Sequence, residues 1–243
     1  MLGLGHGVQT DTAGLAEIFS NNYSLLLDGS DQSVQIDGLA NDFDKANGTM
    51  SAWVRPNSPS ASQRWITVGV DANNFYSIWW HHSANLIKFQ IKSGGNADLA
   101  QFTDTGFASS GNWYHIVATW DSTADEMKLY VNNSLKETDG MDNYGDFTGT
   151  IAIADIGKSG IADDAYWKGN IDEVAIFDET LTAAQVSTLY NGGSPKDVEF
   201  SGLPGLIGYY RFTEGSGTSA VDESGTGNTG TLENAPTWST TVP

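Results

Sequence analysis

The sequence has no cysteine among its 243 residues and only 6 prolines. The absence of cysteine excludes disulfide bonds, thiolate zinc sites and thiol nucleophiles. Glycine, by contrast, is frequent, with 28 residues, and asparagine, aspartate, serine and threonine are common beside it. Such a turn-rich composition is typical of β-sandwiches and barrels and not of helical bundles. With 39% hydrophobic and 11% aromatic residues, the chain is apolar enough to bury a sizeable core.

Basic residues are scarce as well, because 11 lysines and arginines stand against 30 aspartates and glutamates, which gives a net charge of −19 at pH 7. A surface this negative repels phosphate backbones and anionic lipid headgroups, so we expect no nucleic-acid partner and no membrane insertion. The same charge keeps the chain soluble and attracts cations. We favour simple solubility, in an environment whose salt screens the self-repulsion, over a role in storing cations.

Long hydrophobic runs are missing, and nothing in the sequence approaches the length of a transmembrane span. The first seven residues, MLGLGHG, lack the basic region and the apolar run of a secretory signal peptide. We therefore expect the chain to be made without such a peptide. It would then stay in the cytoplasm in which it is made, or reach a virion or the outside of the cell by lysis or within a particle.

The chain divides into an N-terminal arm, residues 1–20, and one domain, residues 21–243. The arm is rich in glycine at its start and compatible with a short helix over residues 13–19. Its apolar side chains suit docking onto a larger protein assembly, and a mobile terminus is an equally good interpretation. No fixed-period repeat and no proline-rich linker divides the remainder, which favours a single domain.

Short apolar segments separated by turns indicate strands along most of the domain. Residues 23–27 and 33–36 flank the turn Asp28-Gly29-Ser30, and we expect them to pair as a hairpin. Residues 113–120 and 128–131 form a second expected pair, joined by an acidic turn. The pattern is that of an all-β domain.

One helix stands out against the strands. Thr182 and Gln185 form a capping box, in which a threonine begins the helix and a glutamine follows three residues later. Val186, Leu189 and Tyr190 then give an apolar stripe at helical spacing. The predicted helix is short, so it must pack on the strands to be stable.

Several segments, in their order and spacing, resemble the laminin-G-like, or concanavalin A-like, lectin family. The segments are Leu27–Gly29, Met50–Pro56, Asn112–Asp121, Lys128–Asn132, Ile156–Lys158 and Gly169–Phe177, followed by the predicted helix with Leu181 before it. The resemblance implies an all-β fold, an antiparallel two-sheet jelly-roll β-sandwich with one short helix. It also implies a function in binding or attachment.

The C-terminal segment departs from the family's usual order. Residues 206–217, with 222–225 and 228–232, resemble the strands that open the domain in most members, whereas here they come last. We hypothesise that the domain is circularly permuted and that these strands join the sheet next to residues 23–27. The termini of a sandwich usually lie close together, so a permutation of this kind costs little.

Two aspartates are candidates for a metal site. In a regular strand, Asp172 shares a face with Val174 and Ile176, and a carboxylate on an apolar face needs a donor network or a cation. Asp28 ends the strand 23–27 in the same way. The family resemblance implies one structural calcium held by such carboxylates, and oxygen ligands suit this ion. The alternative, which we favour, is that each aspartate caps a turn.

Aromatic residues are the second kind of candidate. Alternation places Trp79 and Trp80 on opposite faces of their strand, so that one lies in the core and the other is free to stack on a sugar ring. We assign Trp80 to a ligand-binding set with Tyr144, Tyr166 and Trp167, because the last three lie in segments typical of loops. The alternative is that most of the eight tryptophans fill the core.

We predict that the domain is not an enzyme. Relatives that cleave β-glucans carry two glutamates on one face of a strand, but the corresponding stretch here is Asn170-Ile171-Asp172-Glu173-Val174-Ala175. Strand alternation separates its two carboxylates, and retaining hydrolysis needs such a pair on the same face.

The leaderless, glycine-rich start is similar in style to modules encoded among bacteriophage virion genes. We therefore predict a structural and adhesion protein of a virion, attached through residues 1–20 and able to bind surface glycans. The principal alternative is a free carbohydrate-binding lectin with no role in an assembly. An unrecognised glycosidase is the third and least favoured interpretation.

Overall fold

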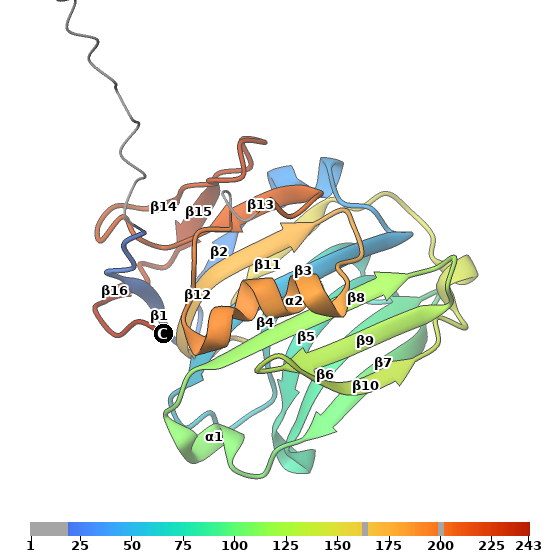
Figure 1. The fold of residues 1–243 in the computed structure, drawn as a ribbon, viewed down its shortest axis with the longest axis horizontal. Coiled ribbons are helices and arrows are strands. Elements are labelled where there is room, and N and C mark those ends of the chain that lie inside the picture. The colour runs from blue at the N-terminus through green and yellow to red at the C-terminus, as the bar shows by residue number, and fades with distance from the viewer. Residues whose placement is uncertain (1–18, 162–164, 199–201) are drawn as a thin grey trace, which may run out of the picture.

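The computed structural model describes residues 19–161, 165–198 and 202–243, so residues 1–18 of the expected arm lie outside the described part. The described residues form two antiparallel sheets of eight strands each (Figure 1). The expectation of an antiparallel two-sheet jelly-roll sandwich with one short helix after the strand at 171–177 is confirmed.

Sheet A contains the family-like segments except Ile156–Lys158, which lies at the end of a strand of sheet B. Its order is β10-β9-β8-β3-β12-β1-β16, and β13 pairs with β12. These strands are β10 (Ser134–Asp139), β9 (Glu126–Val131), β8 (Tyr114–Asp121), β3 (Asn47–Pro56), β12 (Lys168–Phe177), β1 (Ser24–Asp28), β16 (Thr237–Ser239) and β13 (Leu206–Tyr210).

Sheet B has the order β14-β15-β2-β11-β4-β5-β6-β7. Its strands are β14 (Ser219–Ala220), β15 (Gly230–Glu233), β2 (Ser33–Gln35), β11 (Ile153–Ile156), β4 (Gln63–Asp71), β5 (Asn74–His81), β6 (Leu86–Ser93) and β7 (Asn96–Thr103). The helical segments are η1 (Asp37–Asn41), η2 (His82–Ala84), α1 (Phe107–Ser110), η3 (Tyr144–Asp146), α2 (Ala183–Tyr190) and η4 (Asn191–Gly193).

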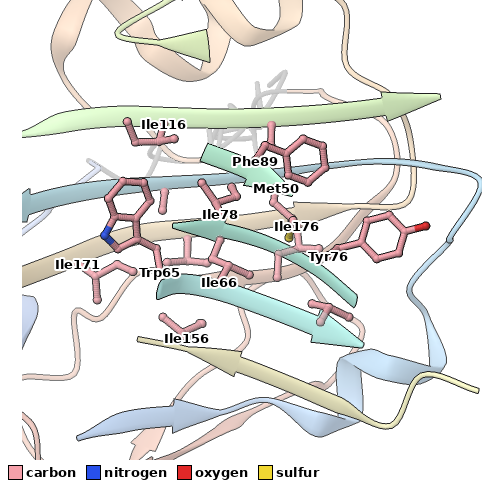
Figure 2. Packing of buried hydrophobic residues seen from close by; sticks show 14 of the residues in the cluster. Met50, Trp65, Ile66, Tyr76, Ile78, Phe89, Ile116, Ile156, Ile171 and Ile176 are labelled. Carbon is pink, nitrogen blue, oxygen red and sulfur yellow. The ribbon is translucent and has the colours of Figure 1, made fainter. Parts of the chain in front are cut away.

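The main core lies between the sheets and is built by strand alternation. Each sheet contributes large apolar side chains to the inner layer. The close view in Figure 2 shows this packing, with contributions that include Met50, Trp65, Ile66, Tyr76, Ile78, Phe89, Ile116, Ile156, Ile171 and Ile176. The tryptophans 65, 80, 120 and 167 are all fully buried, which confirms that much of the tryptophan content fills the core.

The expected hairpin of residues 23–27 and 33–36 is wrong. β1 belongs to sheet A and pairs with β12 and β16, whereas β2 belongs to sheet B and pairs with β11 and β15. The turn after Asp28 therefore carries the chain from one sheet to the other. The predicted pair of β8 and β9 is confirmed.

The C-terminal strands complete both sheets, as the permutation hypothesis requires. β1 pairs with the first half of β12, opposite residues 168–171, and β13 pairs with the second half, opposite residues 174–177. β15 pairs with β2. Figure 1 shows these late strands beside β1 and β2. Ser24 pairs with Ser239, so the two ends of the described sandwich meet in one sheet.

Helix α2 covers the outer face of sheet A, and Figure 1 shows it lying in front of that sheet. Its buried Val186 and Leu189 pack in a second cluster with side chains of β8, β9, β12 and β13. The predicted capping box is confirmed, since Thr182 Oγ1 accepts from the Gln185 amide at 3.4 Å and Gln185 Oε1 accepts from the Thr182 amide at 2.8 Å. No helix among the described residues has the length and apolar character to cross a membrane.

Candidate functional site

The alternation of side chains along β5 decides which of them lie on the outer face of sheet B. Tyr76, Ile78 and Trp80 point into the main core, which leaves Phe75 and Trp79 on the outer face. The assignment of Trp80 to ligand binding is therefore wrong, because its side chain is 0% exposed. Its neighbour Trp79 is half-buried and is the tryptophan of this strand that reaches the surface.

Cations and aromatic rings alternate on this outer face. The Arg64 guanidinium carbon lies 5.0 Å from the centre of the Trp79 ring and 5.3 Å from that of Phe75, so it lies between the two. From the neighbouring β6, Lys88 Nζ lies 5.0 Å from the Trp79 ring and Lys92 Nζ lies 6.0 Å from the Phe75 ring. Cation–π attraction stabilises these contacts.

This covering layer explains why small polar residues beneath it are buried. Thr67 and Ser77 are cross-strand partners, both 0% exposed. Their hydroxyl oxygens are 3.0 Å apart, and Ser77 Oγ also lies 3.0 Å from the Ile66 carbonyl oxygen. The hydroxyl groups of Thr67 and Ser77 thus have hydrogen-bond partners within the sheet, as buried polar groups require.

Polar side chains surround Trp79 on the side of β6 and β7. Gln90 is half-buried and Gln101, opposite Lys88, is exposed. The His81 ring meets the Trp79 ring edge-on at 5.3 Å, and burial lowers the His81 pKa, aided by the charge of Lys88. Trp79 Nε1 and His81 Nδ1 are buried atoms without a hydrogen-bond partner among the described residues. The accessible polar groups of the patch around Trp79 are therefore those of Lys88, Gln90 and Gln101.

The other predicted aromatic residues are dispersed. Trp167 is 0% exposed. Its Nε1 donates to the Asn170 carbonyl at 3.1 Å, so its assignment to ligand binding is also wrong. Tyr144 is half-buried in η3 and packs against the core. Tyr166 is half-buried and follows Ala165, whose carbonyl accepts from the Arg64 amide at 3.1 Å. The backbone therefore brings Tyr166, and not Tyr144, to the Arg64 end of the patch.

Asp28 lies at the rim of the sandwich and caps a turn, as the alternative interpretation expected. Its Oδ1 accepts from the Ser30 amide at 2.8 Å, and its side chain is exposed. Asp28 also lines a rim cavity of about 240 Å³. The other residues of this cavity are Leu26, Leu27, Gln32, Asn57, Lys168 and Thr237.

Asp172 lies on the outer face of sheet A, which corrects the expected alternation. Ile171, Val174 and Ile176 all point into the main core, so one extra residue is accommodated between positions 171 and 174. Glu173 supplies it as a bulge, with φ of +47° and a register shift against β3. Asp172 therefore pairs with Trp53 of β3 and does not share a face with Val174.

The bulge creates a buried polar network. Asp172 accepts from Asn21 Nδ2 at 2.9 Å and from the Glu173 amide at 3.0 Å. The Tyr209 hydroxyl donates to Glu173 Oε2. Arg211 Nε lies 3.7 Å from Glu173 Oε1. Burial raises the pKa of Asp172 well above its usual range, with the neighbouring Glu173 charge adding to the effect. Burial likewise raises the pKa of Glu173 to about 7.

These two carboxylates have no access to a substrate. Asp172 is 0% exposed and Glu173 is 3% exposed. Asp28 is no partner for them, because it pairs with Lys168, four residues from Asp172, or roughly 13 Å along a strand. Among the described residues, no three histidine, aspartate or glutamate side chains gather in a group that could hold a metal ion. The structural calcium stays a prediction.

A further cavity, of about 390 Å³, lies on the sheet A side between β8, β9 and the start of α2. Its charged residues are Asp121, Glu126 and Lys128. They are occupied within the chain, since Lys128 pairs with Glu126 and Asp121 Oδ1 accepts from two backbone amides. The charged side chains of this cavity are therefore engaged within the chain.

Residues 28–187 match the laminin G-type family of the concanavalin A-like lectin/glucanases superfamily. The chain belongs to this family. The match covers more than half of the 243 residues and includes β2 to β12. Among these strands are β4 to β7, which contain the residues of the patch around Trp79. The family resemblance of the sequence is thereby confirmed. No curated protein matches the chain.

Solved structures similar to this laminin G-type domain include proteins that act on or bind sugars. A variant of the NanB sialidase from Streptococcus pneumoniae is 20% identical, with a TM-score of 0.56 over 68% of this chain and 27% of the enzyme. The domain thus spans about a quarter of that sialidase. A proposed carbohydrate-binding protein from Bacteroides ovatus is 15% identical, with a TM-score of 0.60 over 91% of this chain and 60% of that one.

A third similar structure is an isolated binding module. The CBM40 of the Ruminococcus gnavus IT-sialidase, bound to α2,6-sialyllactose, is 15% identical, with a TM-score of 0.55 over 68% of this chain and 94% of that one. At these identities the comparisons show a common fold. The ligand of the laminin G-type domain depends on the residues of its own surface.

Proposed function

We propose that this domain is a non-catalytic carbohydrate-binding module and that its glycan site is the outer face of sheet B around Trp79. The observation that carries the proposal is a half-buried tryptophan surrounded by polar side chains on a sheet face that α2 does not cover. The fold shared with sugar-binding modules supports the same conclusion.

The chemistry of the patch suits a sugar. The C–H face of a pyranose packs well on an aromatic side chain, while its hydroxyl groups need fixed hydrogen-bond partners. Trp79 supplies the apolar surface, and Lys88, Gln90 and Gln101 supply donors and acceptors around it. The contacts of the Trp79 ring with Arg64, Lys88 and His81 restrict its side chain before a ligand arrives, which lowers the entropic cost of binding.

The test is a glycan array followed by calorimetry on the glycan that binds most strongly. Trp79→Ala is expected to weaken that binding at least tenfold, about 1.4 kcal/mol, with little change in the melting temperature. Trp113→Ala is the matched control, since Trp113 is another half-buried tryptophan and lies just before β8 in sheet A. Unchanged affinity in Trp79→Ala, or a loss confined to Trp113→Ala, contradicts the proposed site.

The predicted role in a virion and the attachment through residues 1–20 remain predictions. The described end of the arm is held by Arg211, whose Nη2 donates to the Ser20 carbonyl at 2.8 Å and whose guanidinium lies 4.6 Å from the Phe19 ring. Deleting residues 1–20 should abolish incorporation into a larger assembly and leave glycan binding intact.

The predicted calcium is tested by melting curves recorded with calcium and with a chelator. Bound calcium should raise the melting temperature.

A further inference from the structure

We infer that the glycan recognised by this domain is anionic and that Lys88 and Lys92 of the patch bind its carboxylate or sulfate group. This inference rests on the proposed function and names the class of ligand for the same site.

The distribution of charge on the domain points to such a ligand. The chain has nearly three acidic residues for each basic one, yet the central strands of sheet B reverse this ratio. β4, β5 and β6 contain Arg64, Lys88 and Lys92 but only one carboxylate, Asp71, at the last position of β4. A locally positive face on a strongly negative protein is complementary to an anion.

The lysines of the patch also differ from lysines elsewhere in how they are paired. Lys128 and Lys158 form ion pairs with Glu126 and Asp155. Lys88 and Lys92 form no ion pair within the described part of the chain, and their ammonium groups lie near aromatic rings instead. Asp71 attracts Lys92 only at longer range. Each ammonium group is therefore available to an incoming carboxylate or sulfate.

Partial burial makes Lys88 a good anion partner. Desolvation lowers its pKa, because a half-buried ammonium group has lost part of its hydration without gaining a charged neighbour. An anion that pairs with Lys88 compensates for this lost hydration. The attraction between the two charges is stronger there than in bulk water, because the effective dielectric constant is lower. Lys88 Nζ lies over the Trp79 ring, 5.0 Å from its centre, so an anionic group bound to Lys88 would lie next to the aromatic side chain that we propose contacts the sugar.

Salt dependence is a poor test of this inference. Salt weakens the short-range pairing with Lys88 and Lys92, but it also screens the repulsion between an anionic glycan and the rest of a protein of net charge −19. The two effects oppose each other. Ligands and variants that differ by a single charge separate them.

The experiment compares lactose, sialyllactose and sulfated lactose by calorimetry, after an array that carries neutral and anionic forms of many glycans. The anionic forms are expected to bind at least tenfold more tightly than their neutral counterparts. Lys88→Gln and Lys92→Gln, singly and together, should reduce this preference several-fold. Lys128→Gln, on the opposite sheet, should leave it unchanged, and melting curves confirm that each variant is folded.

The outcomes separate the inference from the proposed function. Equal binding of neutral and anionic glycans that is lost in Trp79→Ala overturns the anionic ligand and retains the sugar site. A preference for anions that depends on Lys128 and not on Lys88 or Lys92 places the anion elsewhere and overturns the inference. If no glycan on the array binds, both the inference and the proposed function fail.

Discussion

Glu173 should make the stability of the domain depend on pH in a direction opposite to that of most carboxylates. Its side chain is 3% exposed, and burial raises its pKa from 4.5 to about 7. Between pH 4.5 and about pH 7, Glu173 keeps its proton in the folded state and has released it in the unfolded state. The stabilisation is therefore complete below pH 4.5 and is lost as the pH rises through 7.

The magnitude follows from the same pKa values. The free energy of unfolding should fall by about 1.4 kcal/mol for each pH unit in this interval, or about 3 kcal/mol over all of it. Glu173→Gln should remove this contribution, because a glutamine has no proton to lose. Its amide oxygen can still accept from the Tyr209 hydroxyl, and Arg211 keeps Glu223, 3.3 Å away, as a partner. The variant should thus be the more stable protein at pH 8.

The assay is urea unfolding followed by tryptophan fluorescence at pH 5, 6, 7 and 8, for wild type and variant. Glu137→Gln is the control, since Glu137 is exposed on β10 and its substitution changes the net charge equally. The difference in unfolding free energy between Glu173→Gln and wild type should grow with pH, while that of the control stays flat. A difference that does not change between pH 5 and 8 refutes the reasoning.

The remaining predictions concern other side chains that the structure buries or pairs. Trp80→Ala should destabilise the domain by about 3–5 kcal/mol in urea unfolding, and Trp79→Ala by much less, because Trp80 is 0% exposed. Thr182→Ala should remove the cap of α2 and cost about 1 kcal/mol in the same assay. Burial lowers the pKa of His115 to about 3, so wild type should lose stability as the pH falls below 6.5. His115→Gln should lose less by about 1.4 kcal/mol per pH unit, and the exposed His82→Gln should behave as wild type.

The sequence predicted the positions of the strands and the helix better than it predicted which strands pair with each other. Alternating apolar residues located the strands, and the capping box at Thr182 located α2, because both signals are local. The hairpin over residues 23–36 failed because the turn after Asp28 has the same chemistry whether its strands pair or pass to different sheets. Pairing is decided by burial across the whole sandwich, which a turn of three residues does not encode.

The sequence contained enough information to identify Trp79, and not Trp80, as the tryptophan on the outer face of β5, but the prediction chose Trp80. The two sets that alternate along β5 are Phe75, Ser77, Trp79 and His81 on one face and Tyr76, Ile78 and Trp80 on the other. The serine and histidine mark the first set as the outer one, since a buried face excludes unpaired polar groups. Lys88 and Lys92 repeat the same signal on β6, where alternate residues are charged.

The bulge at Glu173, by contrast, had no local signal. A positive φ is uncommon for any residue with a side chain, and no glycine marks the position. It is stabilised by contacts from distant segments, namely Tyr209 of β13 and Asn21, which hydrogen-bonds to the neighbouring Asp172. Single-strand alternation therefore placed Asp172 on the wrong face.

The pH predictions for His115 and Glu173 are linked by their place on the outer face of sheet A. Trp53 pairs with His115 on one side and with Asp172, the neighbour of Glu173, on the other. Burial penalises the charged form of each group, but one charge is positive and the other negative. Loss of His115 should therefore tilt the pH dependence of stability one way and loss of Glu173 the other. The double variant should show the sum of the two changes if Trp53 separates the groups, whereas a clear departure from the sum would mean that they interact directly.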